Sequence, residues 1–139
     1  MPKLHPQLSA DCHPLGRYPL SRLLLLNDSN YPWFILVPDR ENIREIYQLA
    51  DDDRLQLLRE SCDLAVFLMQ SFGGDKLNIA ALGNQVPQLH LHHIVSYESD
   101  PAWPFPVWGR HLPVAYSPAA LRDIRMTFAA DGLKDFETA

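Results

Sequence analysis

Two short apolar runs in the first third of the chain predict a pair of adjacent antiparallel strands. The first run covers residues 20–26 and the second covers residues 33–38, and a polar turn that contains Pro32 separates them. Apolar runs flanking such a turn are typical of a β-hairpin, although leucines also favour helices. The preceding residues 1–19 hold several prolines and Gly16, which indicate an N-terminal arm with turns rather than a regular element.

The segment Asp51–Phe72 has the strongest helical pattern in the chain. Its apolar residues recur at intervals of three and four, as expected for the buried face of a helix: Leu55, Leu58, Cys62, Ala65 and Met69. Three aspartates at positions 51–53 would cap the helix and stabilise its N-terminus, and Gly73-Gly74 would end it. On this pattern Cys62 is a small core residue. A shorter helix is expected at residues 43–49.

The second half of the chain predicts two further strands and a final helix. The strands cover residues 77–82 and 88–97, joined by a loop that contains Gly83. Ser117-Pro118 supplies a cap and a first position for a helix through about residue 130. We therefore expect one α+β domain over residues 1–139, with a mostly antiparallel sheet of four to five strands, one long helix and a C-terminal helix.

Residues 100–113 do not fit a regular element. Three prolines within residues 100–109 exclude an interior strand or helix, so we expect an extended stretch that lies on the body of the protein or on a partner subunit. Its aromatic side chains, which include Trp103 and Trp108, are expected to pack in a core or a dimer contact rather than to cover a nucleobase.

Composition narrows the function classes. The 139 residues are 47% apolar and 21% charged, which is typical of a soluble globular domain. The net charge of −5 and the absence of a basic block argue against a nucleic-acid partner, but leave a small nucleotide ligand possible. No C-x-x-C motif, secretory signal or run long enough to cross a bilayer is present, so we expect a cytoplasmic protein without a membrane partner.

The candidate chemistry lies in the last predicted strand. Because side chains alternate between the two faces of a strand, Gln88, His90 and His92 would share one face. His93 would point to the other face, together with leucine and valine side chains, and would have a packing or interface role. Two imidazoles and an amide in a row are a costly way to build a core, and they suit a site for phosphate or metal.

Three interpretations of the two same-face histidines remain open from the local pattern. A neutral imidazole can attack phosphorus and form a phosphoramidate. Alternate histidines on a strand can also bind one zinc ion, with Glu98, Asp100 or His111 as the candidate third ligand. A half-exposed polar face without function is the third possibility. No cofactor is predicted.

The run from Gln88 to Ile94 resembles the signature of the histidine-triad (HIT) family, in which three histidines alternate with apolar residues on a strand. The second and third histidines of the family fall on His90 and His92, and Gln88 stands at the first position. The order of the neighbouring elements agrees, including the strand that ends at Pro38 and the long helix. The resemblance covers about residues 20–97.

The resemblance implies a nucleotide hydrolase or nucleotidyl transferase that works as a homodimer. His90 would form a nucleotidyl-histidine, with its other ring nitrogen oriented by a backbone carbonyl near the third histidine position. His92 would hydrogen-bond the phosphate. Asn27 would contact ribose hydroxyls, and Asn84, which lies where the family often has glutamine, would contact a phosphate oxygen.

The departures from the family pattern bear on activity. Gln88 can donate a hydrogen bond to phosphate but cannot transfer a proton at neutral pH. Trp33 stands where the family usually has a histidine after Pro-Gly, and Ser96-Tyr97 replaces a common Pro-Arg. The catalytic set is therefore His90, His92 and Gln88, with slower turnover expected than in the full triad. A nucleotide sensor with little catalysis is the alternative, beside the metalloenzyme.

Overall fold

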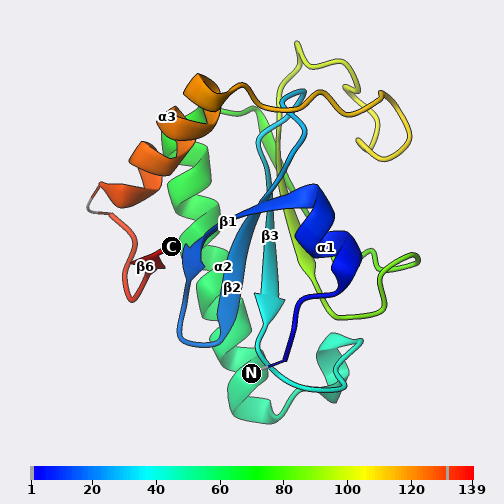
Figure 1. The fold of residues 1–139 in the computed structure, drawn as a ribbon, viewed down its shortest axis with the longest axis vertical. Coiled ribbons are helices and arrows are strands. Elements are labelled where there is room, and N and C mark those ends of the chain that lie inside the picture. The colour runs from blue at the N-terminus through cyan, green and yellow to red at the C-terminus, as the bar shows by residue number, and fades with distance from the viewer. Residues whose placement is uncertain (1, 131) are drawn as a thin grey trace.

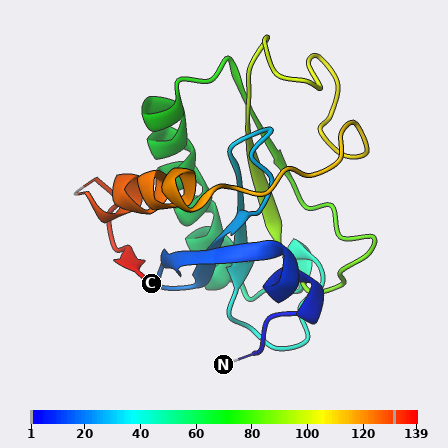
Figure 2. The ribbon, with the colours of Figure 1, turned by 45° about the horizontal axis from the view of Figure 1, so that its top comes forward.

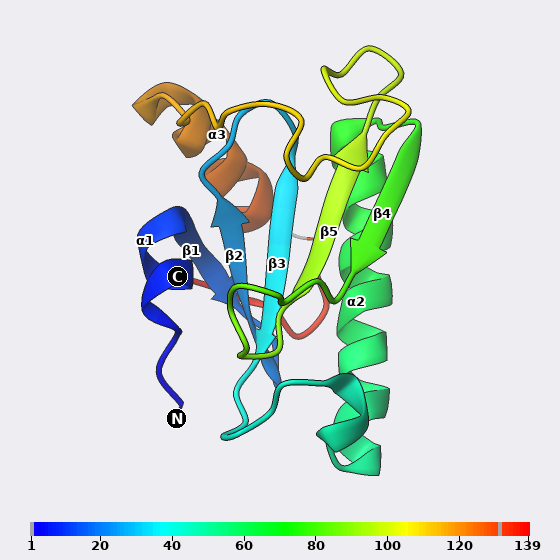
Figure 3. The ribbon, with the colours of Figure 1, turned by 90° about the vertical axis from the view of Figure 1, so that its right-hand side faces the viewer.

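The computed structural model describes residues 2–130 and 132–139, and its centre is a six-stranded antiparallel sheet in the order β4-β5-β3-β2-β1-β6. Figure 3 shows the strands β1 to β5 side by side. The strand bounds are β1 (Cys12–Arg17), β2 (Ser21–Leu26), β3 (Trp33–Pro38), β4 (Lys76–Ala80), β5 (Leu91–Ser96) and β6 (Glu137–Thr138). The α+β class and the antiparallel sheet are as predicted, although the sheet has more strands than the four to five expected.

Helices cover the two faces of the sheet unequally. The long helix α2 (Asp51–Phe72) and the helix α3 (Pro118–Ala129) lie on one face, whereas the short α1 (Pro6–Asp11) lies on the other (Figure 1). A single 3₁₀ turn, η1 (Ile46–Gln48), precedes α2 in place of the short helix expected over residues 43–49. None of the helices within the described residues is long and apolar enough to cross a membrane.

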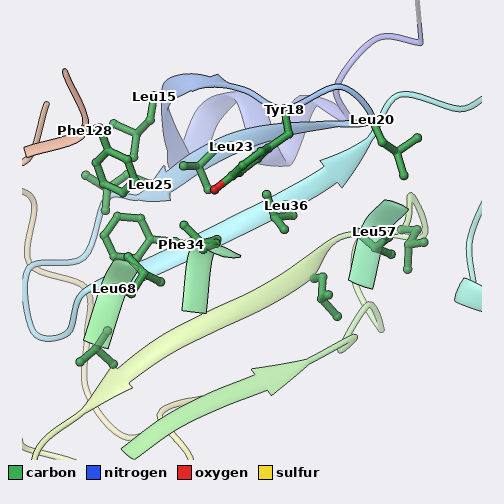
Figure 4. Close-up of a cluster of buried hydrophobic side chains, with 14 of the residues drawn as sticks. Leu15, Tyr18, Leu20, Leu23, Leu25, Phe34, Leu36, Leu57, Leu68 and Phe128 are labelled. Carbon is green, nitrogen blue, oxygen red and sulfur yellow. The ribbon is translucent and has the colours of Figure 1, made fainter. Parts of the chain in front are cut away.

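The predicted hairpin is present, and β3 supplies side chains to two separate cores. Leu23 pairs with Leu36 across β2 and β3. Phe34 and Leu36 belong to the core beneath α2 and α3, part of which Figure 4 shows. Trp33 and Ile35 belong to the core on the opposite face, beneath α1. This period-two alternation gives each face of the sheet its own hydrophobic layer.

Helix α2 has the predicted bounds but not the predicted core face. Leu57, Leu64 and Leu68 are buried, whereas Leu58 is 60% exposed and Cys62 is also exposed, so the assignment of Cys62 to the core was wrong. The buried face also carries Glu60 and Ser61, which makes it less apolar than the exposed stripe. The spacing of apolar residues therefore pointed to the wrong face of the helix. Glu60 is tolerated because one of its carboxylate oxygens accepts the Leu20 N–H at 2.8 Å.

The ends of α2 follow the expected chemistry only in part. Gly73 ends the helix with a left-handed conformation (φ 60°), and its N–H donates to the carbonyl of Met69. At the other end the N-cap residue is Ala50, and no side chain makes a capping hydrogen bond. Asp51, Asp52 and Asp53 therefore act through their charge in the first turn rather than as a cap.

Residues 2–19 contain regular elements, contrary to the expected arm with turns. They contain α1 and then β1, which pairs with β2 on one side and β6 on the other. A register shift between Pro14 and Gly16 accommodates the proline within the strand. Gly16 has φ 156°, and an added Cβ would lie 2.2 Å from the carbonyl oxygen of Glu137, so only glycine lets β6 approach here.

The segment at residues 100–113 is a series of turns rather than an extended stretch (Figure 2). Asp100 holds its start, because one carboxylate oxygen accepts the N–H groups of both Ala102 and Trp103 at 2.8 Å. Ala102 and Val107 are buried in the core on the α1 face. The segment therefore packs on the body of this chain, which is one of the two placements that we expected.

Candidate active site

A cavity of about 720 Å³ lies on the α1 face of the sheet. Its volume is within the range of small-ligand sites. Side chains from β3, β5, α1, the β4–β5 connection and the turn segment meet there. Its lining includes apolar side chains on several sides, namely Leu8, Leu26, Trp33, Ile35, Leu82, Val86 and Trp108, and polar ones, namely Gln7, Asp11, Asn27, Asn84, Gln85, His90 and His92. This mixture suits a ligand with a flat apolar part and a polar part.

His90 sits immediately before β5, and its tautomer is fixed by a backbone contact. Its Nδ1 lies 2.7 Å from the carbonyl oxygen of Gln88. A carbonyl can only accept, so Nδ1 carries a proton, and in the neutral ring Nε2 keeps its lone pair. Nε2 has no hydrogen-bond partner among the described residues. The orienting carbonyl thus belongs to residue 88, the first position of the motif, and not to the third position that the resemblance implied.

His92 lies beside His90, with 4.8 Å between the ring centroids, but both of its ring nitrogens are engaged by protein groups. The indole N–H of Trp33 donates to Nδ1 at 2.9 Å, and Nε2 donates to the carbonyl oxygen of Leu82 at 3.1 Å. The expected hydrogen bond from His92 to phosphate therefore has no free nitrogen to make it in this arrangement. The sequence did not reveal this engagement, because it depends on strand register.

Burial and the neighbouring histidine keep His92 neutral. Desolvation first, and the nearby His90 second, lower the pKa of His92 from 6.5 to about 4, against the opposing effect of the hydrogen bond to Leu82. The ring of Trp108 also packs against His92 edge-on, with centroids 5.1 Å apart and planes at 90°. His92 is thus an uncharged, fixed wall against which the His90 ring packs.

The two asparagines that the resemblance selected both line the cavity. Asn27 follows β2, and its side-chain oxygen accepts the N–H of Tyr116 at 3.0 Å, which leaves its amide nitrogen available to a ligand. Asn84 lies in the β4–β5 connection and is exposed. The structure therefore brings Asn27, Asn84, His90 and His92 to one cavity.

Gln88 departs from the expectation. It precedes β5, which begins at Leu91 rather than at residue 88, so period-two alternation does not apply to it. Its side-chain amide lies against the N-terminal residues, accepting from the N–H of His5 at 2.8 Å and donating to the carbonyl of Lys3 at 3.2 Å. Gln88 does not line the 720 Å³ cavity, and one of the two N–H groups of its amide is bonded to Lys3 rather than offered to a ligand.

His93 points to the opposite face, as alternation predicts, and is fully buried. Its Nδ1 lies 3.1 Å from the carbonyl of Leu91, and its Nε2 lies 2.8 Å from the hydroxyl of Ser61 on α2. Since the carbonyl must accept, Nε2 accepts from the serine. Burial lowers the pKa of His93 to about 4. The predicted packing role of His93 is confirmed.

The metal interpretation finds no ligand set in the part of the chain that the structure describes. Nowhere in residues 2–130 and 132–139 do three or more histidine, cysteine or acidic side chains converge as they would around an ion. Asp100 uses its carboxylate to hold backbone N–H groups of its own loop. With both nitrogens of His92 bonded to Trp33 and Leu82, the histidine pair does not form a zinc site.

Comparison with protein-family models matches the HIT domain over residues 7–99. The chain belongs to the HIT family. The match includes the cavity walls from α1 to β5, and it extends further toward the N-terminus than the resemblance over residues 20–97. A comparison with curated proteins found no significant match.

Solved structures of HIT proteins agree with this fold over nearly its whole length. A histidine triad protein from Marinobacter aquaeolei is 52% identical with a TM-score of 0.88, and the alignment covers 90% of this chain and 91% of that one. One from Bradyrhizobium japonicum is 41% identical with a TM-score of 0.90, covering 91% and 95%. One from Sinorhizobium meliloti is 37% identical with a TM-score of 0.90, covering 94% and 96%.

Two contributions to the site were missed from the sequence of this HIT protein. Helix α1 forms one wall of the cavity, although residues 1–19 were expected to be irregular. His5-Pro6 was the available signal, because proline favours the first helical position and His5 accepts the N–H of Gln7 as the N-cap. Trp33 was noted only as a missing histidine, whereas it supplies the donor that fixes His92.

Proposed function

We propose that this HIT protein is a nucleotide hydrolase or nucleotidyl transferase that forms a covalent nucleotidyl-histidine at His90. The observation that carries the proposal is the hydrogen bond from His90 Nδ1 to the carbonyl of Gln88, which assigns the proton of the neutral ring to Nδ1 and leaves Nε2, beside the cavity, without a partner among the described residues. An uncharged imidazole with a free lone pair is the form of histidine that acts as a nucleophile.

In the proposed first step, the Nε2 lone pair of His90 attacks the α-phosphorus and forms an N–P bond. The bond from phosphorus to the leaving group breaks, and its electron pair leaves with that group. The Nδ1 proton stays on the ring and continues to donate to Gln88 O, which stabilises the positive charge that the ring acquires. Water or another acceptor then attacks phosphorus, and the N–P bond breaks to restore neutral His90.

The binding roles follow from the cavity lining. The apolar side chains, among them Leu8 and Val86, would contact the base. Trp108 packs against the core, as expected, but also lines the cavity, so it would contact the base as well. The amide nitrogen of Asn27 would contact the ribose, and Asn84 would contact a phosphate oxygen. His92 would act as a positioning residue, because its ring packs on His90 while its own nitrogens are held by Trp33 and Leu82.

The rate of this enzyme is expected to depend on how readily the leaving group departs without a protein acid. The side chain of Gln88 cannot supply a proton, and it faces the N-terminal residues. A departing group must therefore take its proton from solvent or need none. A general acid is typically worth about 10²–10⁴-fold in rate. Substrates with good leaving groups, such as an adenosine 5′-phosphorimidazolide, should react faster than esters by a margin of this order.

Trapping the adduct tests the proposal. The protein is incubated with adenylyl substrates labelled at the α-phosphorus, including the phosphorimidazolide, and quenched in alkali, where phosphohistidine survives. Wild type should carry label, and His90→Ala should carry none. His111→Ala is the matched control, because His111 is exposed and does not line the cavity, and it should label normally. Absence of label on wild type with every substrate contradicts the proposed chemistry.

A nucleotide sensor with little catalysis is the second candidate, and it is favoured by Gln88 at the first motif position, whose side chain cannot donate a proton at neutral pH. Calorimetric titration with AMP separates the two functions. AMP binding without any adduct or product supports a sensor, whereas labelled protein supports the enzyme.

We also propose that the working form is a homodimer built on the exposed stripe of α2 and the free edge of β4. Leu55 and Leu58 are exposed, and β4 is an edge strand of the sheet formed by the described residues. Ile79 on β4 is also exposed, and α2 lies behind that edge of the sheet (Figure 3). An unpaired edge strand beside an apolar helix face is a surface that a second copy would cover.

A further inference from the structure

We propose that Gln88 is a positioning residue that fastens α1 against the nucleotide cavity, rather than a substitute for a catalytic histidine. The inference deepens the proposed function, on which its ligand-binding half rests. The side chain of Gln88 has no part in the proposed chemistry, and the inference gives it a role in ligand binding.

The Gln88 amide matches the backbone that it contacts. Its oxygen accepts from the N–H of His5 at 2.8 Å, and its nitrogen donates to the carbonyl of Lys3 at 3.2 Å. A side-chain amide offers a donor and an acceptor next to each other, so one glutamine can pair with two backbone groups of the same segment. A neutral imidazole carries its donor and acceptor on opposite edges of a ring and cannot copy this pairing.

The segment that Gln88 holds leads directly into the cavity wall. His5 is the N-cap of α1, where its Nδ1 accepts the N–H of Gln7 at 3.1 Å. Four residues of α1 then line the cavity, namely Gln7, Leu8, Ala10 and Asp11. At the far end of α1, the Asp11 carbonyl accepts the N–H of Asn27 at 2.9 Å. The helix is therefore tied at one end to Gln88 and at the other to Asn27, the proposed ribose contact.

Gln88 also connects this wall to the nucleophile. Its backbone carbonyl accepts from His90 Nδ1 at 2.7 Å, while its side chain holds His5. One residue thus contacts both the segment that leads into the α1 wall and the His90 ring. Loss of the side chain should free the wall but keep the carbonyl, and so should weaken ligand binding more than it slows chemistry.

Hydrogen exchange and AMP binding test the inference on the full-length protein. In Gln88→Met, which keeps the chain length but removes both hydrogen bonds, amides of residues 4–11 should exchange at least about tenfold faster, as expected for two lost bonds. Exchange in β5 should not change. The Kd for AMP should rise about fivefold or more, while kcat on the phosphorimidazolide stays within about twofold. Gln70→Met on the exposed side of α2 is the matched control and should change none of these.

Two further variants keep the inference falsifiable. Gln88→Glu retains the acceptor for His5 but places an oxygen against the Lys3 carbonyl, so it should loosen the same residues. Gln88→His should behave like Gln88→Met. A Gln88→His protein that turns over faster with an unchanged N-terminal exchange rate would show that position 88 acts on the chemistry and would overturn the inference.

The outcomes separate this inference from the proposed function. Unchanged exchange of residues 4–11 in Gln88→Met shows that Gln88 does not hold α1. Faster exchange with unchanged AMP affinity shows that α1 is not a wall of the ligand site. If wild type binds no AMP, the nucleotide proposal fails and the ligand half of this inference fails with it, whereas the exchange result still decides the anchoring role.

Discussion

The indole N–H of Trp33 on β3 donates a 2.9 Å hydrogen bond to Nδ1 of His92 on β5. The register of the two strands explains the contact, because Trp33 lies opposite Ile94 and Ile35 lies opposite His92, so Trp33 and His92 are diagonal neighbours on one face. The bond stabilises the neutral imidazole, since a charged ring would have no lone pair to accept it. Together with burial, it makes His92 an uncharged neighbour of the proposed nucleophile.

Trp33→Phe should raise the pKa of His92 from about 4 toward its ordinary value of 6.5, because the variant keeps an aromatic ring but loses the donor to Nδ1. Imidazole ¹⁵N shifts followed by NMR across pH 4–7 measure this change. Trp108→Phe is the control, since Trp108 contacts the His92 ring edge-on without a hydrogen bond. An unchanged His92 titration in Trp33→Phe would mean that burial alone keeps the ring neutral.

Acid should destabilise the protein between pH 6.5 and pH 4. His92 and His93 both have folded-state pKa values lowered to about 4, so between these pH values the unfolded chain binds protons that the folded chain does not. Their contribution is fully present above pH 6.5 and is lost as the pH falls, on the order of 3 kcal/mol for each histidine. Urea unfolding at several pH values should therefore show a free energy of unfolding that falls through this window.

A variant that removes one of the two groups tests this assignment. His93→Gln cannot take up the proton, so its free energy of unfolding should depend about half as steeply on pH. His111→Gln, which changes an exposed histidine, should keep the wild-type slope. Equal slopes in all three proteins would place the acid sensitivity in other groups.

Ser61→Ala should destabilise the fold although serine and alanine are close in size. The Ser61 hydroxyl lies 2.8 Å from Nε2 of the fully buried His93, and its removal leaves that nitrogen without a partner. An unsatisfied buried group costs about 1–3 kcal/mol. Urea denaturation measures the loss, and Ser71→Ala on the exposed side of the same helix should change the free energy of unfolding by less than about 0.5 kcal/mol.

Sequence patterns predicted the elements that are defined by residues close together in the chain. The bounds of α2 and the β2–β3 hairpin follow from periodicity, turn residues and the glycine at position 73. The strands β1 and β6 could not be predicted in this way, because β1 depends on pairing with β2 and with the C-terminal residues 137–138. The core face of α2 was misassigned for a related reason: Glu60 and Ser61 become buried through partners on distant elements, Leu20 and His93.

The site residues divide in the same way, into those that the sequence predicted and those whose contacts depend on distant segments. The resemblance to the HIT family pointed to His90, His92, Asn27 and Asn84, and all four line the cavity. It could do so because each residue stands at a recognisable place in the order of apolar and polar segments along the chain. The sequence gives no sign of what the side chains of Gln88 and Trp33 contact. Gln88 precedes the strand on which alternation was assumed, and the bond from Trp33 to His92 depends on register between strands that lie far apart in the chain.

The proposed dimer surface combines the edge of β4 with an apolar stripe of α2 that the core does not use, and the stripe can be tested by itself. Leu58 belongs to the stripe and is 60% exposed. Leu58→Lys should convert a dimer to a monomer, because a charged side chain would be buried against the second copy without a partner. Light scattering coupled to size exclusion measures the mass directly. Leu112→Lys is the matched control, since Leu112 is 87% exposed in the turn segment, outside the proposed surface, and this variant should remain dimeric.

A monomeric wild type, or a Leu58→Lys protein that stays dimeric, would contradict this use of the stripe. In either case the exposed leucines of α2 would need a different partner, because a face this apolar is rarely left to water.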